Sequence, residues 1–498
     1  MLCILLKMTI QTETELPVDF KFTKDFKEAF KLLNDTEKNI FITGNAGTGK
    51  STLLEYFRKE TNKNYAIVAA QGITALKAKG ETIHSFFKFP LHFVTKDDVK
   101  LLKDREVMTK LDTLIIEEAS MVSADIFDAI DTSLKKNRKN KYPFGGVQII
   151  LFGDLMQIEP VITKNEKKLY EKFYPNGAFF FNANCYEESD FNKFELKEIF
   201  RQKDKKFVQL LNKVRDGSIN DTELSVLNKN KIDYETLPEG VIILAPKNNK
   251  VEDINLSNLY KLKTPTFTYN AIIKGNFDDK KCPVDKNLKL KVGAQVMIAK
   301  NDTEDPRRWV NGSIGVIKEL YEDRVKVLVK DKILSIGKAK WDEYKYHFGN
   351  NKIEQYIVGS FIQFPFKLAW AVTIHKSQGQ TFDKVAIDMD RGAFAHGQTY
   401  VALSRGKNLE NTYLLSKINK KDIIADENVI NFINNNKIEN NPRIETRNEE
   451  QNISNGWTST LEKKLLMLYK KNVPEHALAK IFKVSVVEIR GKILKLIK

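Results

Sequence analysis

The chain has few cysteines and no long apolar run, and each absence excludes a class of protein. Only three of its 498 residues are cysteines, and these lie far apart, at Cys3, Cys185 and Cys282. The number is odd and the spacing suits neither a disulfide framework nor a metal site, so we expect reduced thiols and a cytoplasmic location. The apolar residues 1–6 are too short for the core of a signal peptide. No other run approaches the length of a membrane span, so we expect no membrane partner.

Acidic residues are outnumbered by basic ones. Lys and Arg total 81 against 65 Asp and Glu, which gives a net charge of +16. This excess favours a polyanionic partner, but by itself it does not separate nucleic acid from an acidic protein or membrane surface, or from a merely solvated basic surface. A chain of 498 residues with 42% hydrophobic residues is too long for one compact core and indicates three or four domains.

The most informative motif lies near the start of the chain. Residues 44–51 read GNAGTGKS, follow the apolar run 39–43 and lead into a helical pattern. A phosphate-binding loop requires this context, because its glycines let backbone N–H groups point at phosphate oxygens. Lys50 is expected to reach the β- and γ-phosphates of ATP, and the hydroxyl of Ser51 to bind Mg²⁺. The ATP-binding residues predicted here are Gly44, Ala46, Gly47, Thr48, Gly49, Lys50, Ser51 and Thr52.

Further strands are predicted beside this loop. Residues 65–70 form an apolar run that precedes a short helical pattern at residues 72–80, and this alternation indicates a parallel sheet. Two more apolar runs, at residues 111–116 and 147–152, lead into acidic residues. In a parallel sheet these acidic residues lie at the carboxyl edge, where ligands bind. Three separate segments are therefore expected beside one nucleotide.

The segments after these two strands supply three candidate catalytic residues. Glu117 is predicted to hold the metal, and Glu118 to orient the water that attacks the γ-phosphate. Gln157 is an uncharged group that can sense the γ-phosphate through hydrogen bonds. The simpler alternatives are a Glu pair that only solvates the end of a strand and a Gln in an ordinary loop.

The motifs follow one another in an order that is typical of one family. They are the phosphate-binding loop and residues 80–87, 115–122, 153–161, 196–202, 373–382 and 400–405. In these motifs the chain resembles the Pif-one (petite integration frequency) DNA helicases, a group in the RecD-like branch of superfamily 1, over about residues 25–418. The resemblance implies a motor that depends on ATP and Mg²⁺, moves 5′ to 3′ along single-stranded DNA and displaces the complementary strand. Its expected partners are single-stranded DNA and junctions of single- and double-stranded DNA, which it would bind as a monomer.

The resemblance also implies that arginines reach the nucleotide when two lobes close. Arg405 is the first choice for such a finger and Arg201 the second, because a cleft can bring arginine to the γ-phosphate only on closure. Each arginine is also compatible with a structural ion pair. Gln378 and Gly379 are assigned to ATP binding. The chain departs from the family at Glu117, where Asp is usual.

DNA contacts are expected in short polar loops of both lobes. Hydroxyl, imidazole and ammonium donors in these loops can bind phosphates without reading the sequence of bases. Phe86 can offer a stacking face, but core packing is the alternative for at least one of the adjacent aromatics Phe86 and Phe87. The predicted DNA-binding residues are Thr82, His84, Ser85, Phe86, Thr373, His375, Lys376 and Ser377.

The predicted fold is α/β, with two RecA-like P-loop NTPase domains, an inserted SH3-like β-barrel and a C-terminal helical appendage of helix-turn-helix type. Short β-rich pieces indicate the barrel, and a segment rich in Asn and Glu indicates a polar linker. The predicted boundaries are 1–185 for the first RecA-like domain, 186–282 and 364–420 for the second, 283–363 for the barrel, 421–456 for the linker and 457–498 for the appendage.

The role of the appendage and the exact activity leave alternatives open. Helical patterns at residues 461–469, 474–482 and 485–496 fit a small DNA-binding module or a cap that docks on protein. A translocase that strips proteins from single-stranded DNA is the alternative to a helicase within the ATPases. A nucleotide-switched DNA-binding regulator is the alternative from a different class.

Overall fold

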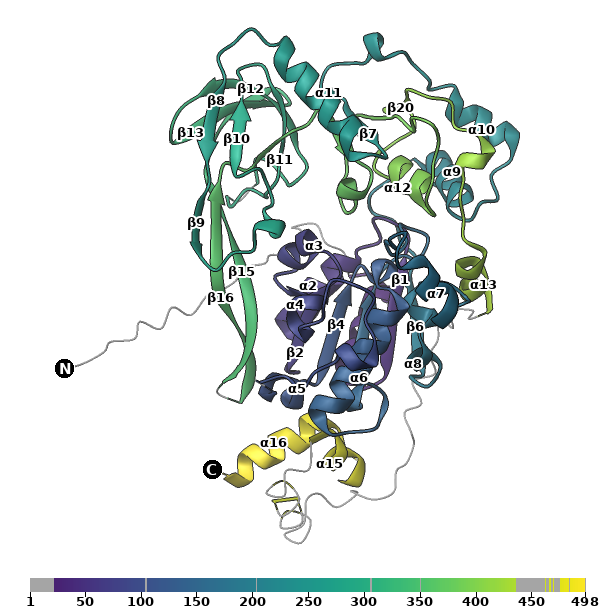
Figure 1. The fold of residues 1–498 in the computed structure, drawn as a ribbon, viewed down its shortest axis with the longest axis vertical. Helices are drawn as coiled ribbons and strands as arrows, with labels where there is room; N and C mark the ends of the chain where they lie inside the picture. The colour runs from purple at the N-terminus through teal and green to yellow at the C-terminus, as the bar shows by residue number, and fades with distance from the viewer. Residues whose placement is uncertain are drawn as a thin grey trace, which may run out of the picture.

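The computed structural model describes residues 22–435, apart from 104, 203, 305–306 and 350, and in the C-terminal region residues 462, 465–466, 469, 475–482 and 484–497. Residues 436–456 of the predicted linker and most of the helical pattern at 461–469 lie outside these described residues. Figure 1 shows two α/β lobes, with a β-rich region beside the second lobe and a long β-ribbon that runs down along the first. The predicted α/β class is confirmed.

The first lobe is built on a parallel sheet of six strands in the order β3-β2-β4-β5-β1-β6. Its strands are β1 (Asn39–Gly44), β2 (Tyr65–Ala69), β3 (Glu81–Thr82), β4 (Thr113–Glu117), β5 (Gln148–Phe152) and β6 (Phe191–Leu196). Its helices are α1 (Lys24–Asp35), α2 (Lys50–Glu60), α3 (Gly72–Lys77), α4 (Ile83–Phe87), α5 (Glu106–Lys110), α6 (Ala124–Arg138), α7 (Lys167–Phe173) and α8 (Asn184–Glu187). The predicted boundary at residue 185 is wrong, because β6 pairs with β1 and therefore belongs to the first sheet.

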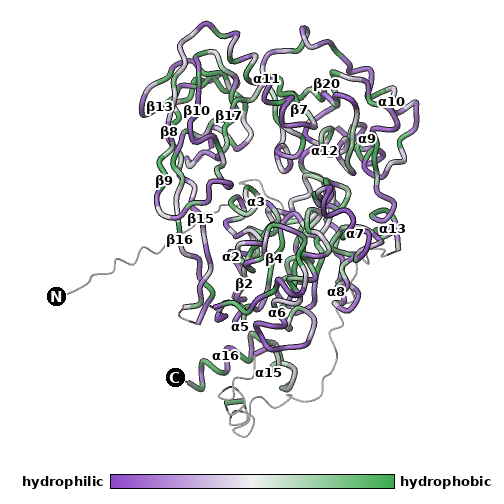
Figure 2. The backbone as a smooth tube through the Cα atoms, in the orientation of Figure 1, coloured by the Kyte–Doolittle hydropathy of each residue, from purple (hydrophilic) through white to green (hydrophobic). Residues whose placement is uncertain are grey.

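Helices cover both faces of this sheet, which explains why its inner strands β1, β2, β4 and β5 are largely apolar. Ile40 and Ile42 of β1 pack in one apolar cluster with α1 and α2, whereas Phe41 packs in another with Phe127 of α6. Alternate residues of a strand point to opposite faces, so both sets of side chains are removed from water. Figure 2 shows hydrophobic segments along these inner strands. The burial fixes the register that brings the carboxyl ends of β1, β4 and β5 to one edge.

The second lobe is smaller, with a parallel sheet of four strands in the order β18-β7-β19-β20. Its strands are β7 (Ile242–Ala245), β18 (Ala371–Thr373), β19 (Val385–Ile387) and β20 (Thr412–Leu414), and its helices are α9 (Lys205–Arg215), α10 (Asp221–Asn228), α11 (Asn248–Lys261) and α12 (Gln398–Leu403). One apolar cluster joins α9, α12 and the sheet. Ile158, which follows β5 of the first lobe, is buried in the same cluster, so the two lobes are in contact there.

The β-rich region lies between β7 and β18 in the chain. Its strands are β8 (Phe267–Asn270), β9 (Ile272–Gly275), β10 (Asn287–Leu290), β11 (Gln295–Ile298), β12 (Ile314–Leu320), β13 (Arg324–Val329), β14 (Lys332–Gly337), β15 (Ala339–Gly349), β16 (Lys352–Gln363) and β17 (Phe366–Leu368). The sheets β10-β8 and β14-β13-β12-β11-β17 share one apolar cluster, as a small barrel requires. The region starts before residue 283 and ends after residue 363, so it is longer than predicted.

The ribbon β15–β16 ties the β-rich region to the first lobe (Figure 1). The hydroxyl of Tyr346 in β15 accepts a hydrogen bond from the backbone N–H of Ile67 in β2, at 2.8 Å. The backbone N–H of Tyr346 donates to the Glu81 carboxylate of β3, at 3.3 Å. The ribbon therefore holds the edge of the first sheet next to α4.

The described C-terminal helices pack against the first lobe. Helix α13 (Glu427–Asn435) lies within the predicted linker, and the Phe432 ring stacks on Phe181 with ring centroids 4.1 Å apart. This part of the linker prediction is wrong because apolar residues recur at helical spacing and are buried against the first lobe. The last helices are α15 (Glu475–Phe482) and α16 (Val486–Ile497).

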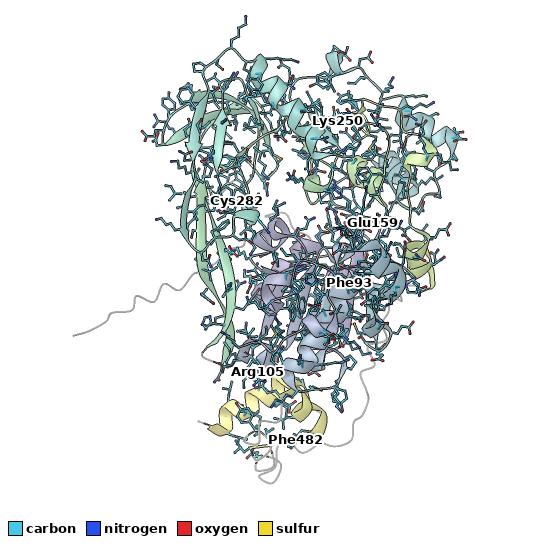
Figure 3. The ribbon with its side chains drawn as sticks, in the orientation of Figure 1. Phe93, Arg105, Glu159, Lys250, Cys282 and Phe482 are labelled. Atoms are coloured by element: carbon cyan, nitrogen blue, oxygen red, sulfur yellow. The ribbon has the colours of Figure 1, made fainter. Side chains whose placement is uncertain are left out.

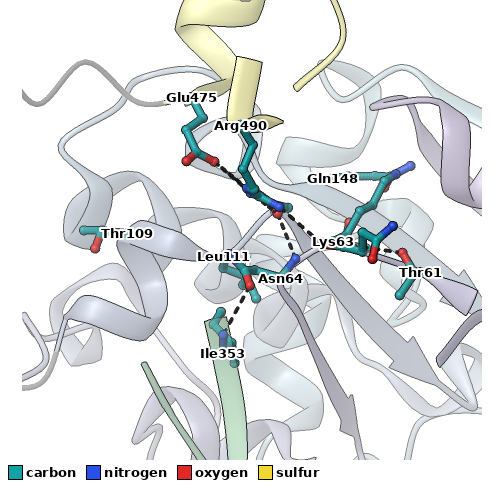
Figure 4. Close-up of polar contacts among 12 residues, drawn as sticks. Thr61, Lys63, Asn64, Thr109, Leu111, Gln148, Ile353, Glu475 and Arg490 are labelled. Carbon is teal, nitrogen blue, oxygen red and sulfur yellow. Dashed lines mark hydrogen bonds and ion pairs between the residues drawn. The ribbon is translucent and has the colours of Figure 1, made fainter. Parts of the chain in front are cut away.

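An ion pair docks α16 on the first lobe (Figure 4). The Arg490 guanidinium donates to the Asp112 carboxylate at 2.6 Å and to Glu475 of α15 at 2.7 Å. Asp112 directly precedes β4, so the contact lies at the amino edge of the parallel sheet, opposite the carboxyl edge. Among the described residues, no helix has the length and apolar character needed to cross a membrane.

Candidate nucleotide site

The phosphate-binding loop has the backbone that its glycines allow. Gly47 and Gly49 have φ angles of 86° and 88°, in the left-handed region that residues with a Cβ avoid, and α2 begins directly afterwards. The Lys50 amine donates to the carbonyl oxygens of Gly44 at 2.7 Å and Asn45 at 3.0 Å. Burial lowers the pKa of Lys50, although the carboxylates of the first lobe oppose this shift. The lysine therefore lies inside the loop, where phosphate oxygens can replace the two carbonyls.

Ser51 and Glu117 form the predicted metal pair. The Ser51 hydroxyl donates to the Glu117 carboxylate at 3.3 Å, which joins the start of α2 to the end of β4. Burial raises the pKa of Glu117 to about 8, and the adjacent Glu118 carboxylate adds to the shift. A carboxyl group with a raised pKa beside a second carboxylate is stabilised in its ionised form by a cation, and oxygen ligands suit Mg²⁺. These residues therefore fit the metal.

The remaining ligands of such a metal must come from elsewhere. The part of the chain that the structure describes contains no cluster of three or more His, Cys, Asp and Glu side chains that could hold an ion. Mg²⁺ commonly keeps several waters and binds proteins through one or two carboxylates plus the phosphates of a substrate. A site of one hydroxyl and one carboxylate beside a phosphate-binding loop matches that pattern.

Asp154 is a central residue that the sequence analysis missed as a site residue. Its buried carboxylate accepts a hydrogen bond from the Arg215 guanidinium of α9 at 2.9 Å, and the Gln157 amide lies 3.4 Å from it. Burial alone would raise the pKa of Asp154, but Arg215 and Lys50 outweigh it and hold this pKa below its usual range. The signal was present, because Asp154 follows the buried strand β5 at the predicted carboxyl edge. Its partner Arg215 lies in the other lobe.

Arg201 lies directly on the phosphate-binding loop. The backbone and Cβ of Arg201 fill the space where a Cβ on Gly47 would be, and the neighbouring Phe200 N–H donates to the Gly47 carbonyl at 2.9 Å. Burial lowers the pKa of the Arg201 guanidinium. Its Nη1 atom is buried and has no hydrogen-bond partner within the described residues. A guanidinium group with an unpaired buried donor at this position is suited to an anionic ligand.

Arg405 is placed differently. Its side chain is 1% exposed and donates to the carbonyl oxygens of Val401, Ser377 and Gln380 and to the Ser404 hydroxyl. All these acceptors are neutral and belong to the second lobe. Burial and then the nearby Arg201 lower the pKa of Arg405 to about 9. The two arginines are thus brought together, but only Arg201 has a donor without a partner in this conformation.

Two further residues join the lobes at this site. The Tyr400 hydroxyl of α12 accepts a hydrogen bond from the backbone N–H of Ala46 at 3.2 Å and lies 3.5 Å from Asp154. The Gln202 amide donates to the carbonyl oxygens of Ser404 at 3.0 Å and Gly406 at 3.1 Å. These two residues are the neighbours of Arg405 in the chain. Neither role was predicted, because both depend on residues about 200 or more positions apart in the chain.

The other predicted nucleotide ligands remain predictions. Gln378 has a buried Nε2 atom that finds no hydrogen-bond partner in the described chain, as expected for a group that meets a ligand. Gly379 is exposed, with a φ angle of 70°. Glu118 also has a positive φ, of 53°, which is uncommon for a residue with a side chain and typical of a functional turn.

The structure corrects part of the predicted DNA contact. Phe86 is 6% exposed, and its ring makes edge contacts with Phe87 and Tyr346, so it belongs to the core and offers no stacking face. Ser377 is fully buried and its hydroxyl donates to the Ile374 carbonyl. Both corrections have one cause: a sequence window does not show which side of a loop faces inward.

Other predicted contact residues shape their loops. The Thr82 hydroxyl caps α4 by accepting the Ser85 N–H at 3.2 Å, and the Ser85 hydroxyl donates to Glu81 at 2.9 Å. The buried Thr373 hydroxyl accepts the Lys376 N–H at 3.3 Å. These hydroxyl groups stabilise the two loops, so their predicted contact with DNA remains a prediction.

Positive charge gathers around the second of these loops. Lys376 is exposed, His375 is half-buried, and burial lowers the pKa of both His375 and His84. Burial lowers the pKa of Lys367 in β17 to about 8, with further lowering by Lys376 and by Lys77 of α3. Lysines from the β-rich region and from both lobes therefore lie within electrostatic reach of one another. Such a group of like charges favours a polyanion.

The fold and the site together define a class of protein. A phosphate-binding loop and strand-end carboxylates on one parallel sheet meet Arg215 and Arg405 of a lobe that is built on a second parallel sheet. This is the arrangement of a P-loop NTPase motor with two RecA-like domains.

Comparisons with known proteins place the chain within a family of this class. Residues 21–225 match the family model described as PIF1-like helicase. The chain is 32% identical over 437 residues to ATP-dependent DNA helicase Pif1 of Campylobacter jejuni. The aligned region covers 79% of this chain and 94% of that protein. The chain belongs to the PIF1-like helicase family, so the predicted family is confirmed, and it is an ATP-dependent enzyme.

Solved structures of Bacteroides Pif1 are also similar. The structure in complex with ADP-AlF4 has a TM-score of 0.79 at 36% identity and covers 85% of this chain and 99% of its own. The structure bound to ssDNA has a TM-score of 0.61 at the same identity and covers 83% and 96%. The RecA-like fold is thereby confirmed, and the overall structure is more similar to the first of these structures than to the second.

Proposed function

We propose that this chain is an ATP-dependent DNA helicase that moves 5′ to 3′ along single-stranded DNA and displaces the complementary strand. Membership of the PIF1-like family supports DNA helicase activity. The direction of movement rests on the resemblance of the motifs. The proposed partners are single-stranded DNA and its junctions with duplex, and ssDNA is present in one of the similar Bacteroides structures.

The first lobe binds the nucleotide in this proposal. Lys50 leaves the carbonyls of its own loop and contacts the β- and γ-phosphates, while Ser51 and Glu117 hold Mg²⁺. The metal, when bound, neutralises phosphate charge. Glu118 orients the attacking water and accepts its proton, and Gln157 senses the γ-phosphate.

Arg201 and the second lobe complete the site. Arg201 has a free donor beside the loop and contacts the γ-phosphate first. Arg405 follows when the lobes close. The negative charge of the transferring phosphoryl group then competes for the Arg405 guanidinium with the neutral carbonyls that accept its hydrogen bonds in this structure. Hydrolysis converts that group to inorganic phosphate, and departure of the phosphate removes its charge, so the lobes separate. This cycle couples ATP turnover to domain movement.

The DNA is proposed to lie across both lobes. Thr82, His84 and Ser85 belong to the first lobe, and His375 and Lys376 to the second. If both loops bind phosphates while the distance between the lobes alternates, the strand advances with each ATP. Lys77 and Lys367 extend this basic surface. One monomer contains all these groups.

One observation carries the proposal: groups from both lobes converge on the phosphate-binding loop, through Arg201, Tyr400 and the Arg215–Asp154 pair. The test is strand displacement with ATP and Mg²⁺ on two partial duplexes that differ only in a 5′ or a 3′ single-stranded tail. We expect unwinding of the 5′-tailed duplex alone, and none with the Glu118→Gln control.

The other outcomes distinguish the remaining functions. Opening of the 3′-tailed duplex alone would reverse the direction. If neither duplex opens while single-stranded DNA still stimulates ATP hydrolysis, the chain is a translocase. DNA that fails to stimulate hydrolysis would argue against a motor and favour a nucleotide-switched regulator.

A further inference from the structure

A buried histidine lies where three segments of the chain meet. His396 precedes α12 in the second lobe and is 2% exposed. Its ring makes an edge contact with Phe179 of the first lobe, with ring centroids 6.0 Å apart. Glu159, labelled in Figure 3 at the boundary between the lobes, lies nearby and accepts the backbone N–H of His396. The site of ATP hydrolysis described above does not include His396.

Hydrogen bonds determine the form of the ring. The backbone N–H of Asp426, just before α13, donates to Nδ1 of His396 at 2.8 Å, so Nδ1 carries a lone pair and no proton. The proton of the neutral ring is therefore on Nε2, which donates to the Leu155 carbonyl at 2.8 Å. One side chain thus joins the second lobe, the segment before α13 and the first lobe.

Leu155 gives this contact its importance. It lies between Asp154 and Gln157 in the loop that follows β5, residues 153–159, which we call the sensor loop. The Leu155 side chain is buried in the core of the first lobe, whereas Ile158 of the same loop is buried in the core of the second. The sensor loop therefore spans the boundary between the lobes, and its backbone position decides where the Asp154 and Gln157 side chains lie.

The residue after the histidine adds a steric contact. A Cβ on Gly397 would overlap the carbonyl oxygens of Met156 and Gln157, so the backbones touch. Gly397 also has a φ angle of 67°, which favours glycine, and its N–H donates to Ile424 at 3.0 Å. The start of α12 is thus packed directly on the sensor loop.

We propose that His396 is a positioning residue for ATP hydrolysis, which holds the sensor loop in register with α12 through the Nε2–Leu155 hydrogen bond. Helix α12 carries Tyr400 and leads to Arg405, so groups that approach the nucleotide from the second lobe move with the loop that bears Gln157 and Asp154. The Asp426 bond fixes the ring orientation, and α13 anchors Asp426 to the first lobe through Phe432.

The consequence is a tie between nucleotide sensing and closure of the lobes. Without the Nε2 donor, the Leu155 carbonyl loses a buried partner, and the sensor loop can shift relative to α12. Binding of ATP, which depends on the phosphate-binding loop, is then retained while turnover falls. This inference rests on the proposed ATPase cycle.

Amide substitutions separate the two hydrogen bonds of the ring. In His396→Gln the amide can replace the Nε2 donor, and in His396→Asn it can replace only the Nδ1 acceptor, whereas His396→Phe keeps the ring contact with Phe179 and removes both bonds. His92 is exposed, and its ring contacts the carbonyl of Phe93, so His92→Asn is a matched control. All variants are compared by steady-state ATPase with single-stranded DNA and by thermal unfolding.

We expect kcat to fall about fivefold in His396→Asn and His396→Phe with an unchanged KM for ATP, and to stay within about twofold of wild type in His396→Gln. In a Gln157→Ala background, the same His396→Asn change should cause no further fall, because the histidine acts through that loop. Equal losses in His396→Gln and His396→Asn, or a loss that persists in the Gln157→Ala background, would overturn the proposal.

A second measurement does not depend on activity. Hydrogen–deuterium exchange of the backbone N–H groups in residues 153–159 should increase in His396→Asn and remain as in wild type in His396→Gln. If wild type shows no DNA-stimulated ATPase but this exchange pattern appears, the proposed function fails while the positioning contact stands. Unchanged exchange in His396→Asn, with ATPase intact in wild type, would refute the contact alone.

Discussion

The two RecA-like sheets contribute unequally to the nucleotide site. The first sheet has six strands, and its carboxyl edge holds Lys50, Glu117 and Asp154 on elements that are buried from both faces. The second has four, three of which are only three residues long. It supplies Arg405 and Tyr400 from the region of one short helix. The phosphate-binding loop and the strand-end carboxylates thus lie in the first lobe, whereas Arg405 and Tyr400 approach them from the second.

The difference is also one of charge. In the first lobe, burial and the neighbouring Glu118 carboxylate raise the pKa of Glu117 to about 8, so its carboxyl group favours the protonated form at neutral pH. In the second lobe, burial and the nearby Arg201 lower the pKa of Arg405 to about 9. Among the described residues of the site, Arg215 and Asp154 form the ion pair that joins the two lobes. A cation would stabilise the ionised form of Glu117, and a phosphoryl group would stabilise the charged form of Arg405.

Substitution of the residue that activates water in the first lobe should have the largest effect. Glu118→Gln removes the group that accepts the proton of water, so we expect kcat for ATP to fall about 10⁴-fold while nucleotide binding is retained. Lys50→Ala should instead lose binding as well. Steady-state ATPase and titration with a fluorescent ATP analogue separate the two variants. Normal turnover in Glu118→Gln would transfer the role to another residue.

The two arginines beside the phosphate-binding loop should rank next. Arg201→Ala and Arg405→Ala are each expected to lower kcat about 10³-fold and to leave the affinity for ATP nearly unchanged, because both act on the transferring phosphoryl group. Arg405→Ala should also lower the thermal unfolding temperature, since it leaves buried carbonyls without donors, whereas Arg201→Ala should not. If the ATPase activity is unchanged in one of the two variants, only the other arginine acts on the phosphoryl group.

The raised pKa of Glu117 predicts a pH dependence of metal use. Below pH 8 the metal-free carboxyl group is protonated, and Mg²⁺ must displace that proton, so affinity rises as the pH rises. The Mg²⁺ concentration that half-activates the ATPase should therefore fall about tenfold per pH unit from pH 6 to 8 and level off above. In Glu117→Gln no carboxyl proton has to be displaced, so the half-activating Mg²⁺ concentration should change with pH only as far as the protonation of ATP requires. If this concentration changes equally with pH in wild type and in the variant, Glu117 is not the metal ligand.

The appendage should have the smallest effect. Deletion of residues 457–498 is expected to change the ATPase by less than about twofold, because Arg490 docks α16 at the amino edge of the first sheet. The length of β4, about 16 Å, separates this edge from the carboxyl edge, where the nucleotide is proposed to bind. Arg490→Ala should detach the helices without the deletion and serves as the matched variant. Loss of ATPase activity in both the deletion variant and Arg490→Ala would show that these helices are part of the motor fold.

Local motifs made much of the first lobe predictable. The loop at residues 44–51 works through its own backbone, and Glu117 and Glu118 follow a strand that is recognisable by its apolar run. Such features depend on neighbours in sequence, so the residue types themselves reveal them. The second lobe was harder, because its strands are short and its arginine is identified only by the motif that surrounds it. Sequence also did not reveal that β6 joins the first sheet or that Phe86 faces the core.

The sequence by itself determined the α/β class, the phosphate-binding loop, the carboxylates at the strand ends and the family of the chain. Only the tertiary structure decided which groups meet there: Asp154 with Arg215, Ala46 with Tyr400, and Leu155 with His396. The reason is physical. A hydrogen bond between residues that are tens to hundreds of positions apart requires both lobes to be folded and in contact, and no local pattern of residues records that distance.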